Sequence, residues 1–221
     1  MGRRSLNELE SARLLSAAGV NMVKSVVLTE SSDAVLRQTA EALGFPVVMK
    51  VLSDDILHKT DLGCVYLNIQ SVEEMRGTYG AILENARKNA PAARVQGIVV
   101  QQMLPKGFEV LLGVSTDPQF GQVLMVGLGG IYVELLKAVS MRVVPISWAD
   151  AEQMIDETPL KAACAGLRGV HYDREEIVEA LLSLSKLCQQ HPEIREVDVN
   201  PFSLYGDRKA TAVDAMVILE D

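Results

Sequence analysis

The sequence is poor in cysteine and contains no long apolar run. Its three cysteines, Cys64, Cys164 and Cys188, are scattered singly over 221 residues. This pattern provides neither a disulfide framework nor the paired spacing of a zinc site, and it is typical of a reducing compartment. No apolar stretch approaches the roughly 18 residues of a membrane-spanning helix, and residues 1–10 lack the apolar run of a signal peptide. We therefore expect a cytoplasmic protein.

Positive charge is also scarce. The chain has 21 Lys and Arg against 29 Asp and Glu, which gives a formal net charge of −8 at pH 7. A nucleic-acid partner is not expected, because such partners require a basic surface. A nucleotide can still bind through a few local cations and a metal. No G-x-G-x-x-G motif follows a strand into a helix, which argues against a dinucleotide-binding fold.

Strands and helices alternate along the chain. Capping residues and apolar periodicity predict helices at residues 5–19, 32–43, 71–89 and 173–190, three of them opened by Ser5-x-x-Glu8, Ser71-x-x-Glu74 and Asp173-x-x-Glu176. β-rich runs predict strands at 25–29, 47–51, 64–69, 95–103, 108–115, 122–126 and 139–145, with a short helix from about Tyr132. This alternation favours mixed α/β (α+β) lobes over one doubly wound parallel sheet.

A predicted hairpin near the C-terminus brings an amide and a carboxylate together. Side chains alternate between the faces of a strand, so one face of strand 196–201 carries Glu196, Asp198 and Asn200. If Tyr205 pairs with Lys209 across a three-residue turn, Asn200 lies opposite Asp214, roughly 5 Å away. Oxygen donors placed in this way suit Mg²⁺ beside substrate phosphates. A solvated hairpin with a polar outer face is the alternative.

Two residues of the first half could carry chemistry. Lys50 ends an apolar strand, and a buried ammonium needs an anion, which is either a protein carboxylate or a ligand phosphate. His58 lies in a long polar loop, residues 53–63. A neutral imidazole can accept a phosphoryl group near pH 7, although a histidine in a loop is commonly just solvated.

Further candidates follow along the chain. The backbone groups of the segment Gln101, Gln102, Met103 and Leu104 could pair with an adenine edge, or the segment could be an ordinary strand end. Glu109 could accept hydrogen bonds from ribose or be a surface acid. Arg142 suits bidentate phosphate recognition but also suits a carboxylate such as Glu134. The glycines Gly127, Gly129 and Gly130 allow a tight turn or a close approach to a ligand.

The order of these features resembles the ATP-grasp fold, in which a nucleotide lies in the cleft between two mixed α/β lobes. More specifically, it resembles the β subunit or fused β domain of NDP-forming acyl-CoA synthetases, the family of ADP-forming acetyl-CoA synthetases related to succinyl-CoA synthetase. The resemblance covers about residues 5–219, and we place the lobes at 1–104, with the leading helix, and 105–221. The motifs that carry it are Gly44-Phe45-Pro46-Val47-Val48-Met49-Lys50, Ile56-Leu57-His58-Lys59-Thr60-Asp61-x-Gly63, Gly107-x-Glu109, Asp117-Pro118-x-Phe120-Gly121, Gly127-Leu128-Gly129-Gly130, Arg142-x-x-Pro145, Asp198-Val199-Asn200-Pro201 and Val213-Asp214-Ala215.

The resemblance implies roles for the matching positions. In the order of the chain, they are phosphate binding by Lys50, phosphoryl transfer by His58, adenine binding by Gln101, Gln102, Met103 and Leu104, ribose binding by Glu109, contact with the transferred phosphate by Arg142, and Mg²⁺ binding by Asn200 and Asp214. The implied ligands are ATP or ADP and Mg²⁺. The implied enzyme is an acid–thiol ligase, incomplete without an α subunit or fused α domain that binds CoA.

One position departs from the family pattern, which has two glycines where this chain has Gly63-Cys64. We expect Cys64 to stiffen or reshape the His58 loop as a small buried residue, not as a nucleophile. Two other functions stay open. One is a non-catalytic ATP-sensing module of a multidomain acyltransferase or synthetase, and the other is a ligase that joins a carboxylate to an amine, for which the His58 loop has no evident use.

Overall fold

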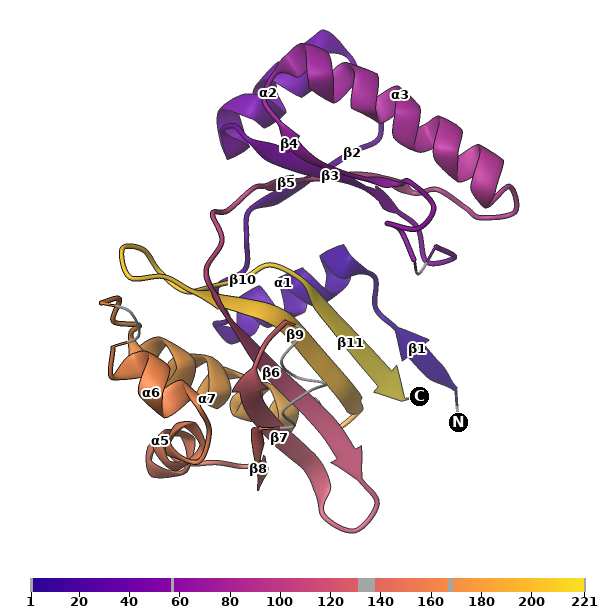
Figure 1. Cartoon of the computed structure of the whole chain (residues 1–221). Helices are drawn as coiled ribbons and strands as arrows, with labels where there is room; N and C mark the ends of the chain where they lie inside the picture. The colour runs from indigo at the N-terminus through magenta and orange to yellow at the C-terminus, as the bar shows by residue number, and fades with distance from the viewer. Residues whose placement is uncertain (1, 57, 131–137, 167–168, 221) are drawn as a thin grey trace. The chain divides into compact units, whose positions relative to one another are not determined.

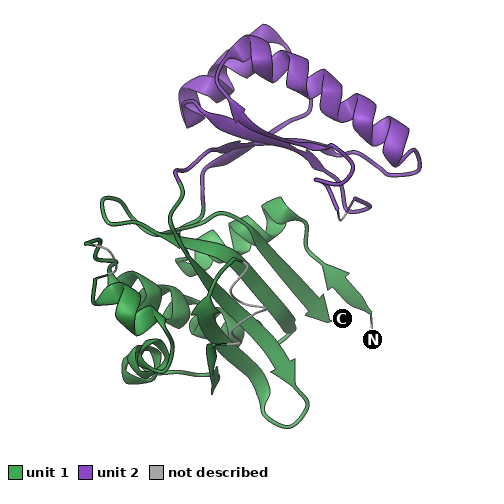
Figure 2. Ribbon diagram, in the orientation of Figure 1, with its two compact units in different colours: residues 1–22, 106–221 green, residues 23–105 purple. Residues whose placement is uncertain are grey.

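The chain forms two compact units. The computed structural model describes residues 2–56, 58–130, 138–166 and 169–220 (Figure 1). Unit 1 consists of residues 1–22 and 106–221, and unit 2 of residues 23–105 (Figure 2). None of the helices in these described ranges combines the length and the apolar composition of a membrane span.

Unit 2 is a four-stranded antiparallel sheet with two helices on one face (Figure 1). Its strand order is β2-β5-β3-β4, and its elements are β2 (Ser25–Leu28), α2 (Asp33–Leu43), β3 (Val47–Leu52), β4 (Val65–Ile69), α3 (Val72–Asn89) and β5 (Gly97–Gln102). Val47, Met49 and Val51 alternate along β3 and belong to a core cluster that also contains Leu36 and Ile82 from the helices. The intervening residues of β3, Lys50 among them, therefore project from the opposite face of the sheet.

Unit 1 is built on a seven-stranded antiparallel sheet. Its strand order is β1-β11-β9-β6-β7-β8, and β10 pairs with β9. Its elements are β1 (Arg3–Ser5), α1 (Glu8–Ala18), β6 (Phe108–Asp117), β7 (Gly121–Leu128), β8 (Val139–Val143), α5 (Trp148–Asp156), α6 (Leu160–Cys164), α7 (Arg174–Gln190), β9 (Ile194–Leu204), β10 (Thr211–Ala212) and β11 (Ala215–Glu220). The predicted apolar stripe of α7 is confirmed, because Ile177, Leu181 and Leu184 are all fully buried in the core of this unit.

The leading helix belongs to unit 1, which differs from the expected first lobe of residues 1–104. The strand β1 pairs antiparallel with β11, α1 packs against β11 and α7, and Leu15 is fully buried in the unit 1 core. The buried hydroxyl of Ser11 also accepts a hydrogen bond from the amide of Val217 (3.2 Å). The other expected boundary, after residue 104, lies one residue from the end of unit 2 at Pro105.

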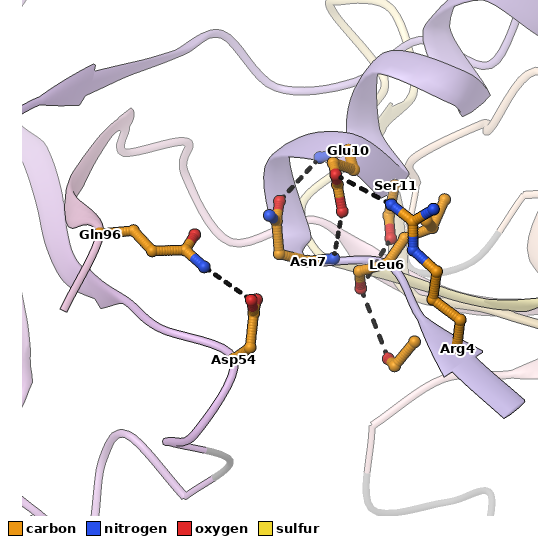
Figure 3. A network of polar contacts seen from close by, with 8 residues as sticks. Arg4, Leu6, Asn7, Glu10, Ser11, Asp54 and Gln96 are labelled. Atoms are coloured by element: carbon orange, nitrogen blue, oxygen red, sulfur yellow. Dashed lines mark hydrogen bonds and ion pairs between the residues drawn. The ribbon is translucent and has the colours of Figure 1, made fainter. Parts of the chain in front are cut away.

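The start of α1 also differs from the prediction. Ser5 lies in β1, and the capping box is formed by Asn7 and Glu10 (Figure 3). The Asn7 side chain accepts from the amide of Glu10, and the Glu10 carboxylate accepts from the amide of Asn7, both at 3.0 Å. The predicted cap of α3 is confirmed, because the Ser71 hydroxyl accepts from the amide of Glu74 (3.1 Å). The helix expected from about Tyr132 lies outside the described residues.

The burial of Cys188 makes stability depend on pH. Cys188 lies on α7 and is 1% exposed, and burial raises the pKa of its thiol from 9.0 to about 11. Between these values the unfolded chain releases a proton that the folded chain retains, so stability falls as pH rises through the window. The loss is about 1.4 kcal/mol for each pH unit, or up to about 3 kcal/mol in all.

The variant Cys188→Ala isolates this effect. Denaturant titrations of both proteins at about pH 8 and about pH 10.5 should show a smaller loss of stability in the variant, since the other groups titrate alike in the two proteins. Equal losses in the two proteins would show that the thiol of Cys188 ionises as readily in the folded state as in the unfolded state.

Candidate functional site

The closing hairpin of unit 1 places Asn200 opposite Asp214. The pairs on either side of this position are Ala212 with Phe202 and Ala215 with Val199. Both pairs belong to one register, which is the register predicted from the sequence. Asp214 lies between β10 and β11, and continuing this register between the two pairs sets it opposite Asn200. Both side chains are exposed. The carboxylate of Asp214 also accepts a hydrogen bond from the amide of Ala215 (2.9 Å), which orients it.

Negative charge accumulates on the same face of the sheet. Asp198 is two residues from Asn200 in β9 and therefore points the same way. Burial raises the pKa of Asp198 above its ordinary value, and the charges of Asp214 and Glu196 raise it further. Sequence analysis placed Asp198 on this face but gave it no role, because its burial depends on neighbouring strands. A divalent cation would offset the repulsion between these carboxylates.

The hairpin supplies only some of the oxygen ligands that a divalent ion needs. A bound molecule would have to supply others. In the part of the chain that the structure describes, no three His, Cys, Asp or Glu residues come together as a metal site. An amide oxygen and a carboxylate are fewer ligands than a protein cage would need. They fit Mg²⁺, which is commonly bound by one or two carboxylates together with substrate phosphates and water. The residues present therefore fit a metal–nucleotide complex better than a bare metal ion.

Glu109 lies beside the glycine cluster of unit 1. It pairs with Ser203 in the β6–β9 ladder, and its carbonyl oxygen accepts a hydrogen bond from the amide of Gly129 (2.8 Å). A Cβ atom on Gly129 would lie 2.8 Å from the carbonyl carbon of Glu109, so a side chain there cannot fit without a backbone shift. A glycine is thus required at this position by contact with Glu109. The role of Glu109 at a ribose stays a prediction.

Arg142 forms an ion pair on the helix-covered face of the sheet. It lies opposite Leu124, which is fully buried in the core of unit 1, and its guanidinium contacts the carboxylate of Glu157 at 2.6 Å. This hydrogen bond raises the pKa of Arg142 and lowers that of Glu157. The structure does not bring Arg142 onto the face of Asn200 and Asp214. It supports the ion-pair alternative with a different carboxylate, since Glu134 lies outside the described residues.

Lys50 and Gln101 share one face of the sheet of unit 2. Their strands pair with Lys50 opposite Val99 and Val48 opposite Gln101, so both side chains project from the face that the helices do not cover. They are 8% and 5% exposed. An ammonium group this deeply buried needs an anion or several hydrogen-bond acceptors beside it, which is compatible with either of the two alternatives drawn from the sequence.

Two amides of the predicted adenine segment already bond within unit 2. The amide of Gln102 donates to the carbonyl oxygen of Lys24, and that of Met103 donates to Pro46, both at 3.0 Å. These two amides are therefore engaged in this conformation, and adenine binding by residues 101–104 stays a prediction. Any adenine contact by residues 101–104 would use other groups of the segment.

The His58 loop is exposed at its centre and anchored at its ends. His58 is exposed, whereas Ile56 and Cys64 are 2% and 0% exposed in the core of unit 2. Burial raises the pKa of the Cys64 thiol, which opposes formation of a thiolate. The prediction that Cys64 is a small buried residue is confirmed, and its lack of a nucleophilic role stays a prediction. Leu57 lies outside the described residues.

Comparison with known proteins identifies the fold. The family model described as "ATP-grasp domain" matches residues 1–219. The chain belongs to the ATP-grasp family. It is 43% identical over 222 residues to the acetate–CoA ligase (ADP-forming) II subunit β of Pyrococcus furiosus, with 99% of this chain and 93% of the relative covered. The expected ATP-grasp fold is confirmed.

Two solved structures superpose closely on this chain. An acetyl-coenzyme A synthetase 1 of Ca. Korarchaeum cryptofilum in complex with coenzyme A, Ca-AMPCP and HgCl⁺ is 39% identical, with a TM-score of 0.91 over 99% of this chain and 95% of that chain. Another structure of that enzyme holds coenzyme A and Mg-AMPPCP, with a phosphohistidine segment pointing towards the nucleotide binding site. It is 37% identical, with a TM-score of 0.83 over 98% of this chain and 93% of that chain.

Proposed function

We propose that this chain is the nucleotide-binding β component of an ADP-forming acyl-CoA synthetase, an acid–thiol ligase that needs a CoA-binding α subunit or fused α domain. The observation that carries the proposal is the register that sets Asn200 opposite Asp214 on one face of the hairpin. The similarity to a β subunit over 99% of the chain supports it, as does the nucleotide analogue held by a closely similar structure.

The proposed residue roles follow from charge and position. Asn200 and Asp214 would hold Mg²⁺ with the nucleotide phosphates, and the ion, when bound, neutralises charge on the transferred group. Lys50 supplies a fixed cation for the phosphates from a rigid strand. Glu109, on β6, accepts hydrogen bonds from ribose. Lys50, Glu109 and Asn200 lie on paired strands, and Asp214 lies between the strands β10 and β11. Such fixed positions suit a reaction whose catalysis is mainly placement and electrostatics.

His58 is proposed as the phosphoryl carrier of this chain. Its imidazole accepts the phosphoryl group from ATP at a ring nitrogen, with ADP as the leaving group, and later passes the group to the α partner. The loop around it leaves the imidazole exposed, as a carrier between two sites requires. The scattered free cysteines remain the basis for proposing a cytoplasmic location.

Reconstitution with a CoA-binding α subunit of a related ADP-forming ligase tests the function. We expect ATP to phosphorylate the assembled enzyme with release of ADP in the same step, and we expect continued turnover with release of phosphate to depend on an acid and CoA. The phosphorylation step is measured with radiolabelled ATP, so it does not depend on knowing the acid. Binding of ATP without any phosphorylation in the assembly would favour the ATP-sensing module instead.

A further inference from the structure

Two asparagines of α3 hold the end of the His58 loop. The side-chain amide of Asn85 donates to the carbonyl oxygen of Gly63 (2.7 Å), and that of Asn89 donates to the carbonyl oxygen of Leu62 (3.1 Å). Asn85 and Asn89 are one helical turn apart and lie on the same face of α3. Two consecutive carbonyls of the loop are thus bound by two consecutive turns of one helix.

Asn85 itself is held in a defined position. Its amide nitrogen also donates to the hydroxyl of Tyr66 (3.2 Å), so both of its donors are engaged. Gly63 has φ +63, and a Cβ there would lie 3.1 Å from the amide nitrogen of Asn85. The left-handed conformation at Gly63 and the close approach of Asn85 therefore depend on the same glycine. The helix behind them is fixed by Met75 and Ile82, which are fully buried.

The beginning of the loop is fastened to the segment that follows α3. The carboxylate of Asp55 accepts from the amide of Arg94 (2.7 Å), and the carboxylate of Asp54 accepts from the side-chain amide of Gln96 at 2.6 Å (Figure 3). Both ends of the loop are therefore bound to one stretch of chain, residues 85–96. Such attachment limits the positions that the loop centre can adopt.

The attachment reaches the backbone of His58 directly. The carbonyl oxygen of His58 accepts from the amide of Leu62 (3.3 Å), and the amide of Cys64 donates to Lys59 (2.8 Å). Leu62 is the residue whose own carbonyl is bound by Asn89. A shift of the asparagines would therefore pass through Leu62 to the peptide of His58.

We propose that Asn85 and Asn89 are positioning residues for His58, and we call the pair the amide clamp. The inference rests on the proposed role of His58 as a phosphoryl carrier. A carrier must reach the γ-phosphate with its nitrogen aligned for attack, and an error of about 1 Å in such placement costs on the order of 100-fold in rate. The clamp holds the end of the loop that carries the imidazole, at Leu62 and Gly63.

The test replaces the clamp donors by isosteric acceptors. Asn85→Asp and Asn89→Asp keep the side-chain size but remove the N–H donors, and they set a carboxylate against a carbonyl oxygen. In the assembled enzyme, we expect each variant to lower the rate of phosphate transfer from ATP to this chain by about 10- to 100-fold. ATP affinity should change by less than about twofold. The control is Glu84→Gln, the reverse exchange at an exposed position of α3, which should transfer phosphate at the unmodified rate.

Hydrogen exchange provides a second readout that does not depend on the reaction. Backbone amides of residues 58–64 should exchange about tenfold faster or more in the clamp variants, with unchanged exchange in the strands of unit 2. Unchanged exchange in both variants overturns the clamp, whatever the rates show. A loss of ATP affinity together with faster exchange throughout unit 2 also overturns it, in favour of a general structural role. If His58→Ala retains phosphate transfer, the proposed carrier fails, and the exchange result still decides whether the clamp exists.

Discussion

Replacing His58 with Ala is expected to abolish phosphorylation of this chain and to lower turnover of the assembled enzyme by about 1,000-fold or more, the scale of losing a nucleophile. The imidazole is the group that forms the bond to phosphorus, and alanine has no atom that can replace it. Its exposed side chain makes no contribution to the core, so the loss should come from chemistry and not from unfolding. The measurement is radiolabelled phosphate retained by this chain after its separation from the partner.

The chain provides its own matched controls for this experiment. It has three histidines, and His191 contacts Glu193 at the end of α7, far along the chain from the loop. His191→Ala should retain both the labelled phosphate and turnover. ATP affinity should be the same in both variants, because neither side chain is assigned to nucleotide binding. Full turnover by His58→Ala in the presence of the α partner would exclude the carrier role.

Asp214→Asn is expected to reduce the phosphorylation rate at saturating Mg²⁺ by about 100-fold or more. Mutating even the indirect partners of metal ligands costs about 10- to 100-fold in metal affinity or activity. Asp214→Asn removes the negative charge of a side chain proposed to bind the ion directly. The asparagine oxygen can still accept the hydrogen bond from the amide of Ala215, so the hairpin should persist. The rate is measured as a function of Mg²⁺ concentration, and the midpoint should move to higher concentration.

Asp207→Asn is the matched control for this substitution. Asp207 lies in the turn of the same hairpin, is exposed, and contacts Arg208, so the same chemical change occurs away from the proposed ligands. We expect its rate and Mg²⁺ midpoint to equal those of the unmodified enzyme. The same midpoint in Asp214→Asn as in the control would show that Asp214 is not a ligand.

The hairpin could be predicted from the sequence because its determinants are local. The alternation of side chains along strand 196–201 and the short polar turn were enough to predict the register of the hairpin. The structure has this register, which sets Asn200 opposite Asp214. The burial of Cys64 was expected where the His58 loop meets the next strand, and the structure places it in the core of unit 2. In both cases the pattern and the structure involve residues close together in the chain.

The features that sequence analysis missed depend on contacts between distant segments. The leading helix joins unit 1 because β1 pairs with β11, at the other end of the chain. The partner of Arg142 is a glutamate 15 residues away, and the bonds of Asn85 and Asn89 to the loop span 22 and 27 residues. Two asparagines on a helix have no distinctive pattern, so only the folded structure assigns them to the loop.

A titration of ATP with and without Mg²⁺ tests the central claim most directly. Calorimetry on the unmodified chain should show binding that is strengthened at least about tenfold by Mg²⁺, and Asp214→Asn should lose that strengthening. Lys50→Ala should weaken binding under both conditions, since it removes a phosphate contact and no metal ligand. Equal binding with and without Mg²⁺ in the unmodified chain, undiminished in both variants, would contradict a metal–nucleotide site at the hairpin.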